Sequence, residues 1–269
     1  MPRYGGILNF GEFRGFTRDL VLWNLAAYFL LAMLGLVSPQ GYLSLFQFLA
    51  LTPVYFVHGQ IWQIVTYPFV HQGILNTAFE LLSLWFLGSF LEGNLGTRWL
   101  MEIFAVSALG AGVAAIVLAE ATNITAIPII GCWGAIFGLL IAFGVLYAEM
   151  EFMMFPLPVM IKAKYLVAVY LLIAVAMLYV SVDRIFAFSQ LGGALFGYLY
   201  VKFAPRRGLS TAGRAQYFDW RNQYYRWKRK RAARKFQVYM KKQNRDVRFD
   251  DEGKYIDPDK DPNDRSKWN

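Results

Sequence analysis

Residues 131–147 read GCWGAIFGLLIAFGVLY, an apolar run that contains no charged side chain. A membrane-crossing helix needs about 20 mostly apolar residues, and about 17 is the lower limit, so this run has the length of a short span. Gly134 and Gly138 lie four positions apart, on one face of such a helix, where small residues let two membrane helices pack closely. The run therefore predicts a transmembrane helix whose glycine face contacts a neighbouring helix.

The rest of the chain has the same apolar character. Of its 269 residues 57% are apolar and 17% are charged, below the roughly 25% charged residues of an average soluble domain. This composition excludes a disordered chain, and the one cysteine excludes a disulfide scaffold. A large soluble helical core would need far more polar surface than the chain has. We therefore predict six spans, the other five being Leu20–Val37, Ile74–Leu91, Trp99–Leu118, Tyr165–Val182 and Ile185–Phe203.

Positive charge is concentrated after the last predicted span. Residues 202–248 carry 16 Lys/Arg and two Asp, a net charge of +14, whereas residues 1–201 carry −2 and residues 249–269 carry −3. Because Lys and Arg accumulate in cytoplasmic loops, both termini are predicted to be cytoplasmic. The N-terminal segment has no short apolar region with a cleavage site, so we expect the first helix to be retained as an anchor. The predicted organisation is a cytoplasmic segment, a membrane domain, a basic cytoplasmic helix and a disordered acidic tail, at residues 1–18, 19–204, 205–248 and 249–269.

The segment between the first two predicted spans, residues 38–73, is long for a loop in a compact bundle. It is also rich in apolar and aromatic side chains, which prefer the membrane interface to water. We expect a structured, membrane-associated loop on the outer side.

Four short motifs follow one another along the chain: WQIVTYPFVH at 62–71, LEGNLGTR at 91–98, GCWGAIFG at 131–138 and QLGGALFG at 190–197. They resemble, in order, the Trp-Arg…Thr…Phe-x-His, Leu-Glu…Gly-x-x-Arg, Gly-x-Ser-Gly-Ala-x-x-Gly and His-x-x-Gly-x-x-x-Gly patterns of the rhomboid family of intramembrane serine proteases. The resemblance covers about residues 15–203 and implies an all-α, polytopic, six-helix rhomboid-like bundle. The family positions that this chain retains are Trp62, His71, Glu92, Arg98, Gly131, Gly134, Gly138, Gly193 and Gly197.

The departures from the family pattern affect its catalytic positions. The nucleophilic serine aligns with Trp133 and the base histidine with Gln190. The two groups that stabilise the oxyanion align with Asn76 and Glu80, and the loop arginine aligns with Gln63. An indole is a donor and no nucleophile, and a glutamine amide has no useful basicity near neutral pH. We therefore expect no catalytic residue and no useful serine-protease activity from this site.

Other chemistries find little support in the sequence. Cys132 is one residue before the serine position and so points about 100° around the helix from it, and a single buried cysteine is usually inert. The chain has two histidines, His58 and His71, and no Cys/His/Asp cluster is evident along it. We expect no metal site and no cofactor.

Glu80 is the most informative single residue of the predicted membrane domain. It lies in the middle of a span, where a charge costs at least about 2.5 kcal/mol. With the rhomboid arrangement, Asn76, Glu80, Trp133 and Gln190 would form a polar cluster in which the Trp133 indole could donate to Glu80. Two roles stay open: Glu80 holds the bundle together, or it serves a ligand or a client protein.

The segment after the last span is predicted to be a basic helix with an aromatic face. A basic helix that carries aromatic side chains next to a membrane is typical of association with anionic lipid headgroups. The alternatives are a solvated helix that only fixes topology and, less favoured, nucleic-acid binding. The residues expected at the lipid surface are Trp220, Trp227, Lys228, Arg229, Lys230, Arg231, Arg234 and Lys235.

Two functional classes follow from the sequence. The favoured one is an integral membrane pseudoprotease that binds or routes transmembrane client proteins, with a bacterial inner membrane as the expected location. The alternative, which the family resemblance alone would imply, is a rhomboid-type intramembrane serine endopeptidase.

Overall fold

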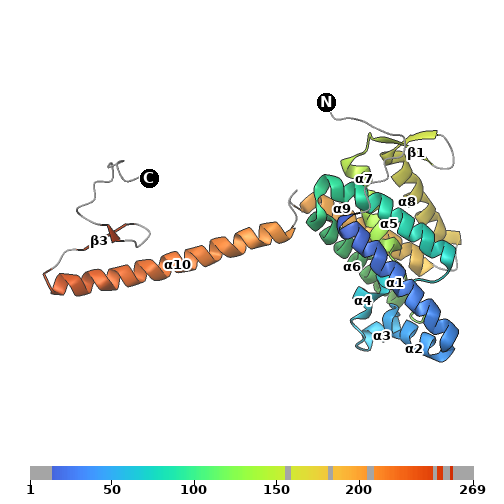
Figure 1. Ribbon diagram of the computed structural model, residues 1–269, viewed down its shortest axis with the longest axis horizontal. Coiled ribbons are helices and arrows are strands. Elements are labelled where there is room, and N and C mark those ends of the chain that lie inside the picture. The colour runs from blue at the N-terminus through green and yellow to red at the C-terminus, as the bar shows by residue number, and fades with distance from the viewer. Residues whose placement is uncertain are drawn as a thin grey trace. The chain divides into compact units, whose positions relative to one another are not determined.

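The computed structural model describes residues 14–154, 159–180, 184–204, 209–244, 247–250 and 255–256. The chain divides into two compact units, residues 1–208 and 209–269, which are described separately. The first unit is a bundle of helices, shown in Figure 1, and the second contains one long helix with a short strand pair.

Each predicted span coincides with a helix of the first unit. The helices are α1 (Gly15–Val37), α5 (Ile74–Leu95), α6 (Thr97–Thr122), α7 (Trp133–Leu146), α8 (Ala163–Val180) and α9 (Arg184–Phe203). Among the described residues, α1, α5 and α6 are long and apolar enough to cross a membrane, and α7 and α8 are shorter apolar helices. The first unit is therefore a helical bundle of the kind found in membranes.

The outer surface of the bundle is apolar, as a lipid-facing surface must be. On α1 the side chains of Trp23, Met33 and Leu36 are 70%, 65% and 87% exposed. In water this exposure would be costly, whereas hydrocarbon solvates such side chains without cost. The apolar residues of α1 thus serve the lipid contact more than the core.

The segment between α1 and α5 is structured, as expected. It forms α2 (Pro39–Leu49), α3 (Pro53–Val57), α4 (Gln63–Thr66) and the 3-10 helix η1 (Tyr67–Phe69). Leu51 and Ile129 exchange two backbone hydrogen bonds of 3.0 and 2.8 Å, which tie this segment to the strand-like residues before α7. The Tyr67 hydroxyl donates to the Ala108 carbonyl of α6 at 2.6 Å. These bonds fix the segment against the bundle.

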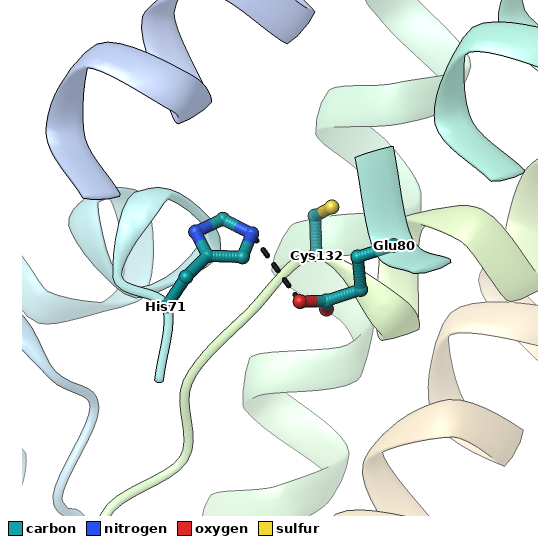
Figure 2. Close-up of side chains that lie close together, drawn as sticks. All are labelled: His71, Glu80 and Cys132. Atoms are coloured by element: carbon teal, nitrogen blue, oxygen red, sulfur yellow. Dashed lines mark ion pairs between the residues drawn. The ribbon is translucent and has the colours of Figure 1, made fainter. Parts of the chain in front are cut away.

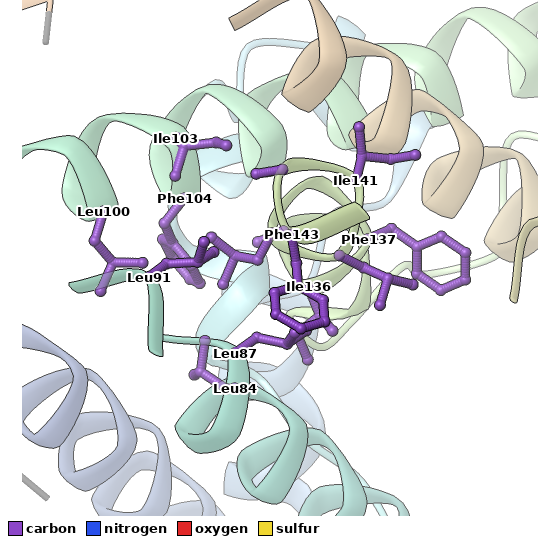
Figure 3. Packing of buried hydrophobic residues seen from close by; sticks show 14 of the residues in the cluster. Leu84, Leu87, Leu91, Leu100, Ile103, Phe104, Ile136, Phe137, Ile141 and Phe143 are labelled. Carbon is purple, nitrogen blue, oxygen red and sulfur yellow. The ribbon is translucent and has the colours of Figure 1, made fainter. Parts of the chain in front are cut away.

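The core of the first unit lies between α5, α6, α7 and α9. Its buried side chains come from all four helices, and Figure 3 shows those that surround α7. α9 packs mainly against α6 and α7. At the α7–α9 contact glycine faces glycine: a Cβ on Gly193 would collide with the Gly134 carbonyl, and one on Gly197 would lie 2.5 Å from the Gly138 Cα. The two backbones therefore touch directly.

A short hairpin follows α7, formed by β1 (Glu151–Met154) and β2 (Val159–Lys162). Next to it, Glu149 accepts hydrogen bonds from Lys162 at 2.8 Å and from Lys164 at 2.5 Å. These two ammonium groups lower the pKa of the Glu149 carboxyl to about 2. The group is fully exposed, so the ion pairs contribute little to stability.

The second unit consists of α10 (Leu209–Lys242) and the strands β3 (Arg248–Phe249) and β4 (Tyr255–Ile256), which pair antiparallel. The Phe249 ring lies 6.2 Å from Phe236 and 6.1 Å from Tyr255. A short strand pair therefore crosses the expected boundary at residue 248. Residues 251–254 and 257–269 of the expected acidic tail lie outside the described residues.

Candidate functional site

The site lies at the N-terminus of α7, where segments far apart in sequence meet. The Gly131 amide donates to the Val70 carbonyl at 2.8 Å. This bond places Cys132, the residue before α7, beside His71, the residue after Val70. Glu80 reaches the same point from α5, in contact with Gly131. His71, Glu80 and Cys132 are all buried.

Glu80 binds the N-terminus of α7 with one of its carboxylate oxygens. The backbone N–H of Trp133, the first residue of α7, donates to Oε1 of Glu80 at 3.1 Å. The first amides of a helix have no partner within the helix and attract anions, so a carboxylate satisfies them well. Gly131 has φ +82°, and a Cβ there would collide with Oε1. Glycine at this position therefore lets the carboxylate approach the helix end.

Glu92, at the other end of α5, makes a second contact of the same kind. It accepts the backbone N–H groups of Phe16 and Thr17 at the start of α1, both at 2.8 Å, and the Thr17 hydroxyl at 2.7 Å. Here too a positive-φ glycine, Gly15, leaves room for the carboxylate. α5 thus caps the N-termini of two neighbouring helices with its two glutamates. This parallel favours the structural role for Glu80.

The second carboxylate oxygen of Glu80 faces a different group. Oε2 lies 3.3 Å from Nε2 of His71, and both side chains have no exposed surface. The two atoms are within ion-pair distance, but neither meets hydrogen-bond geometry with any described group. The ligand atoms of His71, Glu80 and Cys132 all lie within 4.8 Å of one another. Figure 2 draws the three side chains, with a dashed line between His71 and Glu80.

The polar cluster expected from the sequence is present only in part. The Trp133 indole donates to Oδ1 of Asn76 at 3.3 Å, so the expectation that it donates to Glu80 was wrong. The backbone amide of Trp133 bonds to Glu80 instead, and the indole meets the exposed residue Asn76. Gln190 is 7% exposed on α9, and in the described part of the chain no hydrogen bond joins it to the other three residues.

The retained and altered positions of the long loop have structural contacts. Trp62 donates from Nε1 to the Phe48 carbonyl at 2.9 Å and packs on the Phe48 ring. Gln63, at the position of the family arginine, is fully buried; it accepts the Thr52 amide at 3.0 Å and donates to the Gln47 carbonyl at 2.9 Å. The side-chain amide of Gln63 thus joins three parts of this loop without introducing a charge. Arg98 is exposed at the start of α6.

The chemistry that this site can perform is limited by its residues. Acyl transfer needs a nucleophile next to a base and a free group of donors for the oxyanion. At the N-terminus of α7 the Trp133 amide is already bonded to a carboxylate, and the Trp133 indole belongs to the residue that the motif resemblance aligns with the family serine. A carboxylate there disfavours a second anion through like-charge repulsion. The geometry favours a buried carboxyl group that occupies the helix end over an open oxyanion site.

The sequence reasoning missed the position of Cys132. Its expected angle of about 100° from the serine position gave it no role at this site. In the structure its sulfur lies within 4.8 Å of the ligand atoms of Glu80 and His71, and Figure 2 draws the three side chains together. The sequence signal for this position was the eight-residue interval between His71 and Glu80, together with the family motif at 131–138. Both His71 and Glu80 meet the N-terminus of α7, where that motif begins.

The second unit presents the predicted basic residues on α10. Lys228, Arg229, Lys230, Arg231, Arg234 and Lys235 are all exposed. Trp227 is 55% exposed and stacks with Tyr224 at 6.3 Å, and the Arg231 guanidinium lies 5.4 Å from the Trp227 ring centre. The side chain of Trp220 lies outside the described residues.

Comparison with known proteins gives a family assignment. A sequence profile described as the rhomboid domain matches residues 58–207. Rhomboid-like protein 19 from Arabidopsis thaliana is 28% identical over 154 residues, which is 54% of this chain and 49% of the relative. The chain thus spans about half the length of this curated relative.

Proposed function

This chain belongs to the rhomboid family and is an integral membrane protein, and we propose that it is a pseudoprotease that binds or routes transmembrane client proteins. The observation that carries the proposal is the state of the α7 N-terminus. Glu80 binds the amide of Trp133 there, and the family nucleophile and base are replaced by Trp133 and Gln190. On this proposal the chain keeps the family fold and lacks the nucleophile and the base that acyl transfer needs.

A groove on the membrane-facing side supports the client role. It has a volume of about 830 Å³, and its lining includes Trp23 of α1, Pro68 of η1 and Phe104 and Leu109 of α6. The lining is mostly apolar, with Asp19 among its residues. A transmembrane segment that carries a large apolar side chain and one donor would fit such a groove, because bilayer helices associate by close packing and isolated polar contacts.

Photo-crosslinking in membranes tests the client role. A photoreactive amino acid at position 23, inside the groove, is expected to give discrete protein adducts. The same amino acid at position 172, where Leu172 is 67% exposed on α8, is the matched control and is expected to give lipid adducts alone.

Filling the groove supplies the second control for this experiment. Ala105 is exposed and lines the groove, so Ala105→Trp should remove the adducts from position 23 without affecting the core. Identical adducts at positions 23 and 172, or adducts that persist after Ala105→Trp, would count against a client groove.

The proposal includes six spans and cytoplasmic termini. α9 has 20 residues and carries Arg184 and Lys202 near its ends, where long basic side chains reach the interface. The distribution of Lys and Arg around the spans supports the cytoplasmic placement. Rhomboid-like protein 19 is a plant protein, so the comparison does not support the expectation of a bacterial inner membrane, and the proposal is confined to an integral membrane location.

The proposal also assigns the basic helix α10 to anionic lipid. The six exposed basic side chains at residues 228–235 and the exposed Trp227 are what an interfacial helix requires, and each basic residue near an anionic surface contributes about 1 kcal/mol. We expect the second unit alone, residues 209–269, to co-sediment with vesicles rich in phosphatidylserine and to remain in solution with neutral vesicles. Equal binding to both vesicle types would contradict the electrostatic part of this assignment.

The alternative function, intramembrane serine endopeptidase, requires another nucleophile and another base. Cys132 is the nearest thiol to the former site, and its neighbours are a carboxylate and a buried imidazole.

A further inference from the structure

Three buried side chains at the N-terminus of α7 form a set of metal ligands that the pseudoprotease role does not use. They are His71, Glu80 and Cys132, and they come from the end of the long loop, from α5 and from the residue before α7. Figure 2 shows the imidazole and the carboxylate facing each other with the thiol beside them. Each residue offers one ligand atom, and these atoms lie within 4.8 Å of one another.

The ligand atoms that point into this cluster lack hydrogen-bond partners. Among the described residues, no group meets hydrogen-bond geometry with Nδ1 or Nε2 of His71 or with Oε2 of Glu80. Both side chains have no exposed surface. Buried polar atoms are nearly always satisfied, because leaving one unpaired costs about 1–3 kcal/mol. Nε2 of His71 and Oε2 of Glu80 face each other at 3.3 Å without a hydrogen bond, and one ion bound by both atoms would satisfy them.

We propose that His71, Glu80 and Cys132 bind a zinc ion. Zinc binds a thiolate at about 2.3 Å and imidazole or carboxylate at about 2.0–2.2 Å, and a tetrahedral site then holds its ligand atoms about 3.3–3.7 Å apart. The Nε2–Oε2 distance of 3.3 Å already fits, and the sulfur needs to move inward by at most about 1 Å. A mixed set of nitrogen, oxygen and sulfur ligands favours zinc over magnesium or calcium, which take oxygen ligands.

Charge supports the same assignment. A zinc ion with one carboxylate, one thiolate and a neutral imidazole has no net charge, so the burial of the site carries no unpaired ion. Binding releases the thiol proton of Cys132, and the sulfur donates the electron pair that forms the zinc bond.

The ligand residues are also held in place from outside the cluster. The other carboxylate oxygen of Glu80 accepts the Trp133 amide, and the Gly131–Val70 bond fixes Cys132 against His71. Such second contacts orient metal ligands in known sites. Three protein ligands leave one position of a tetrahedral ion for a small molecule such as water.

Cobalt binding tests the proposal, because Co²⁺ replaces zinc in such sites and absorbs light. The full chain in detergent, stripped with a chelator, is titrated with Co²⁺ alone. We expect one Co²⁺ per chain, visible bands of a four-coordinate ion and a near-ultraviolet thiolate-to-cobalt band. Added Zn²⁺ should remove all of these bands. Because Cys132 is the one cysteine of the chain, the thiolate band reports on this site alone.

Variants provide the controls. C132S should lose the thiolate band and H71A should weaken binding at least tenfold, while H58A, which removes the exposed second histidine, should bind as the wild type does. Zn²⁺ should raise the unfolding temperature of the wild type and of H58A but not that of C132S. No thiolate band in the wild type, or equal cobalt binding by C132S, would overturn the proposal. If the wild type shows no thiolate band, His71 and Glu80 form a buried pair without a metal ion. If C132S does not fold, C132A is measured in its place, and the wild-type titration still decides.

Discussion

Replacing Gly193 by alanine is expected to prevent the bundle from reaching its folded state or to lower its free energy of unfolding by at least about 3 kcal/mol. The added Cβ would collide with the Gly134 carbonyl and lie 3.0 Å from the Gly134 Cα, so α7 and α9 would have to separate. Overpacking against side chains costs about 1–3 kcal/mol, and a collision with backbone cannot be relieved by a rotamer change. The yield of monodisperse protein in detergent and its thermal unfolding temperature measure the effect.

Gly93→Ala is the matched control for this substitution. Gly93 also lies inside a helix, α5, but a Cβ there meets nothing within 4 Å. The same chemical change should therefore be neutral or stabilise the protein by about 0.5–1 kcal/mol through helix propensity. Equal behaviour of the two alanine variants would show that the α7–α9 backbones do not touch.

Replacing Glu80 by leucine is expected to lower the free energy of unfolding by about 2–4 kcal/mol. Leucine leaves the Trp133 amide and the His71 ring buried without their partner, and each unpaired buried group costs about 1–3 kcal/mol. Glu80→Gln keeps an acceptor for the Trp133 amide, so its loss should be less than half as large. Thermal and denaturant unfolding in a fixed detergent compare the two variants.

Phe79→Leu controls for changes at the adjacent position, since Phe79 is 62% exposed to lipid and touches no part of the site. Crosslinking to clients from position 23 should be unchanged in folded Glu80→Gln protein if the carboxylate is structural. A client adduct that disappears while the unfolding temperature is kept would assign Glu80 to client binding instead.

The parts of the fold that depend on composition and on short spacings between residues could be predicted from the sequence. The apolar runs predicted helices at six places, and the glycine pairs at 134/138 and 193/197 predicted a close helix contact, since residues four apart share a helix face. The departures at Trp133 and Gln190 were evident from the motifs alone.

The contacts that the sequence did not reveal join residues far apart in the chain. Glu92 caps α1 from 75 and 76 positions away, and Glu80 reaches Trp133 across 53 positions. Nothing in either glutamate's own segment specifies which helix end it meets. The place of Cys132 depends in addition on the Gly131–Val70 bond, which forms only when the long loop packs against the bundle.

The most direct test of the central claim, a rhomboid fold without serine-protease chemistry, is labelling with a fluorophosphonate probe. The purified chain in liposomes is incubated with the probe beside a catalytically competent rhomboid protease. We predict no labelling above that of the heat-denatured chain, because Trp133 occupies the nucleophile position and Glu80 binds the adjacent amide. Labelling of the native chain that disappears after a single point substitution would contradict the claim and identify the nucleophile.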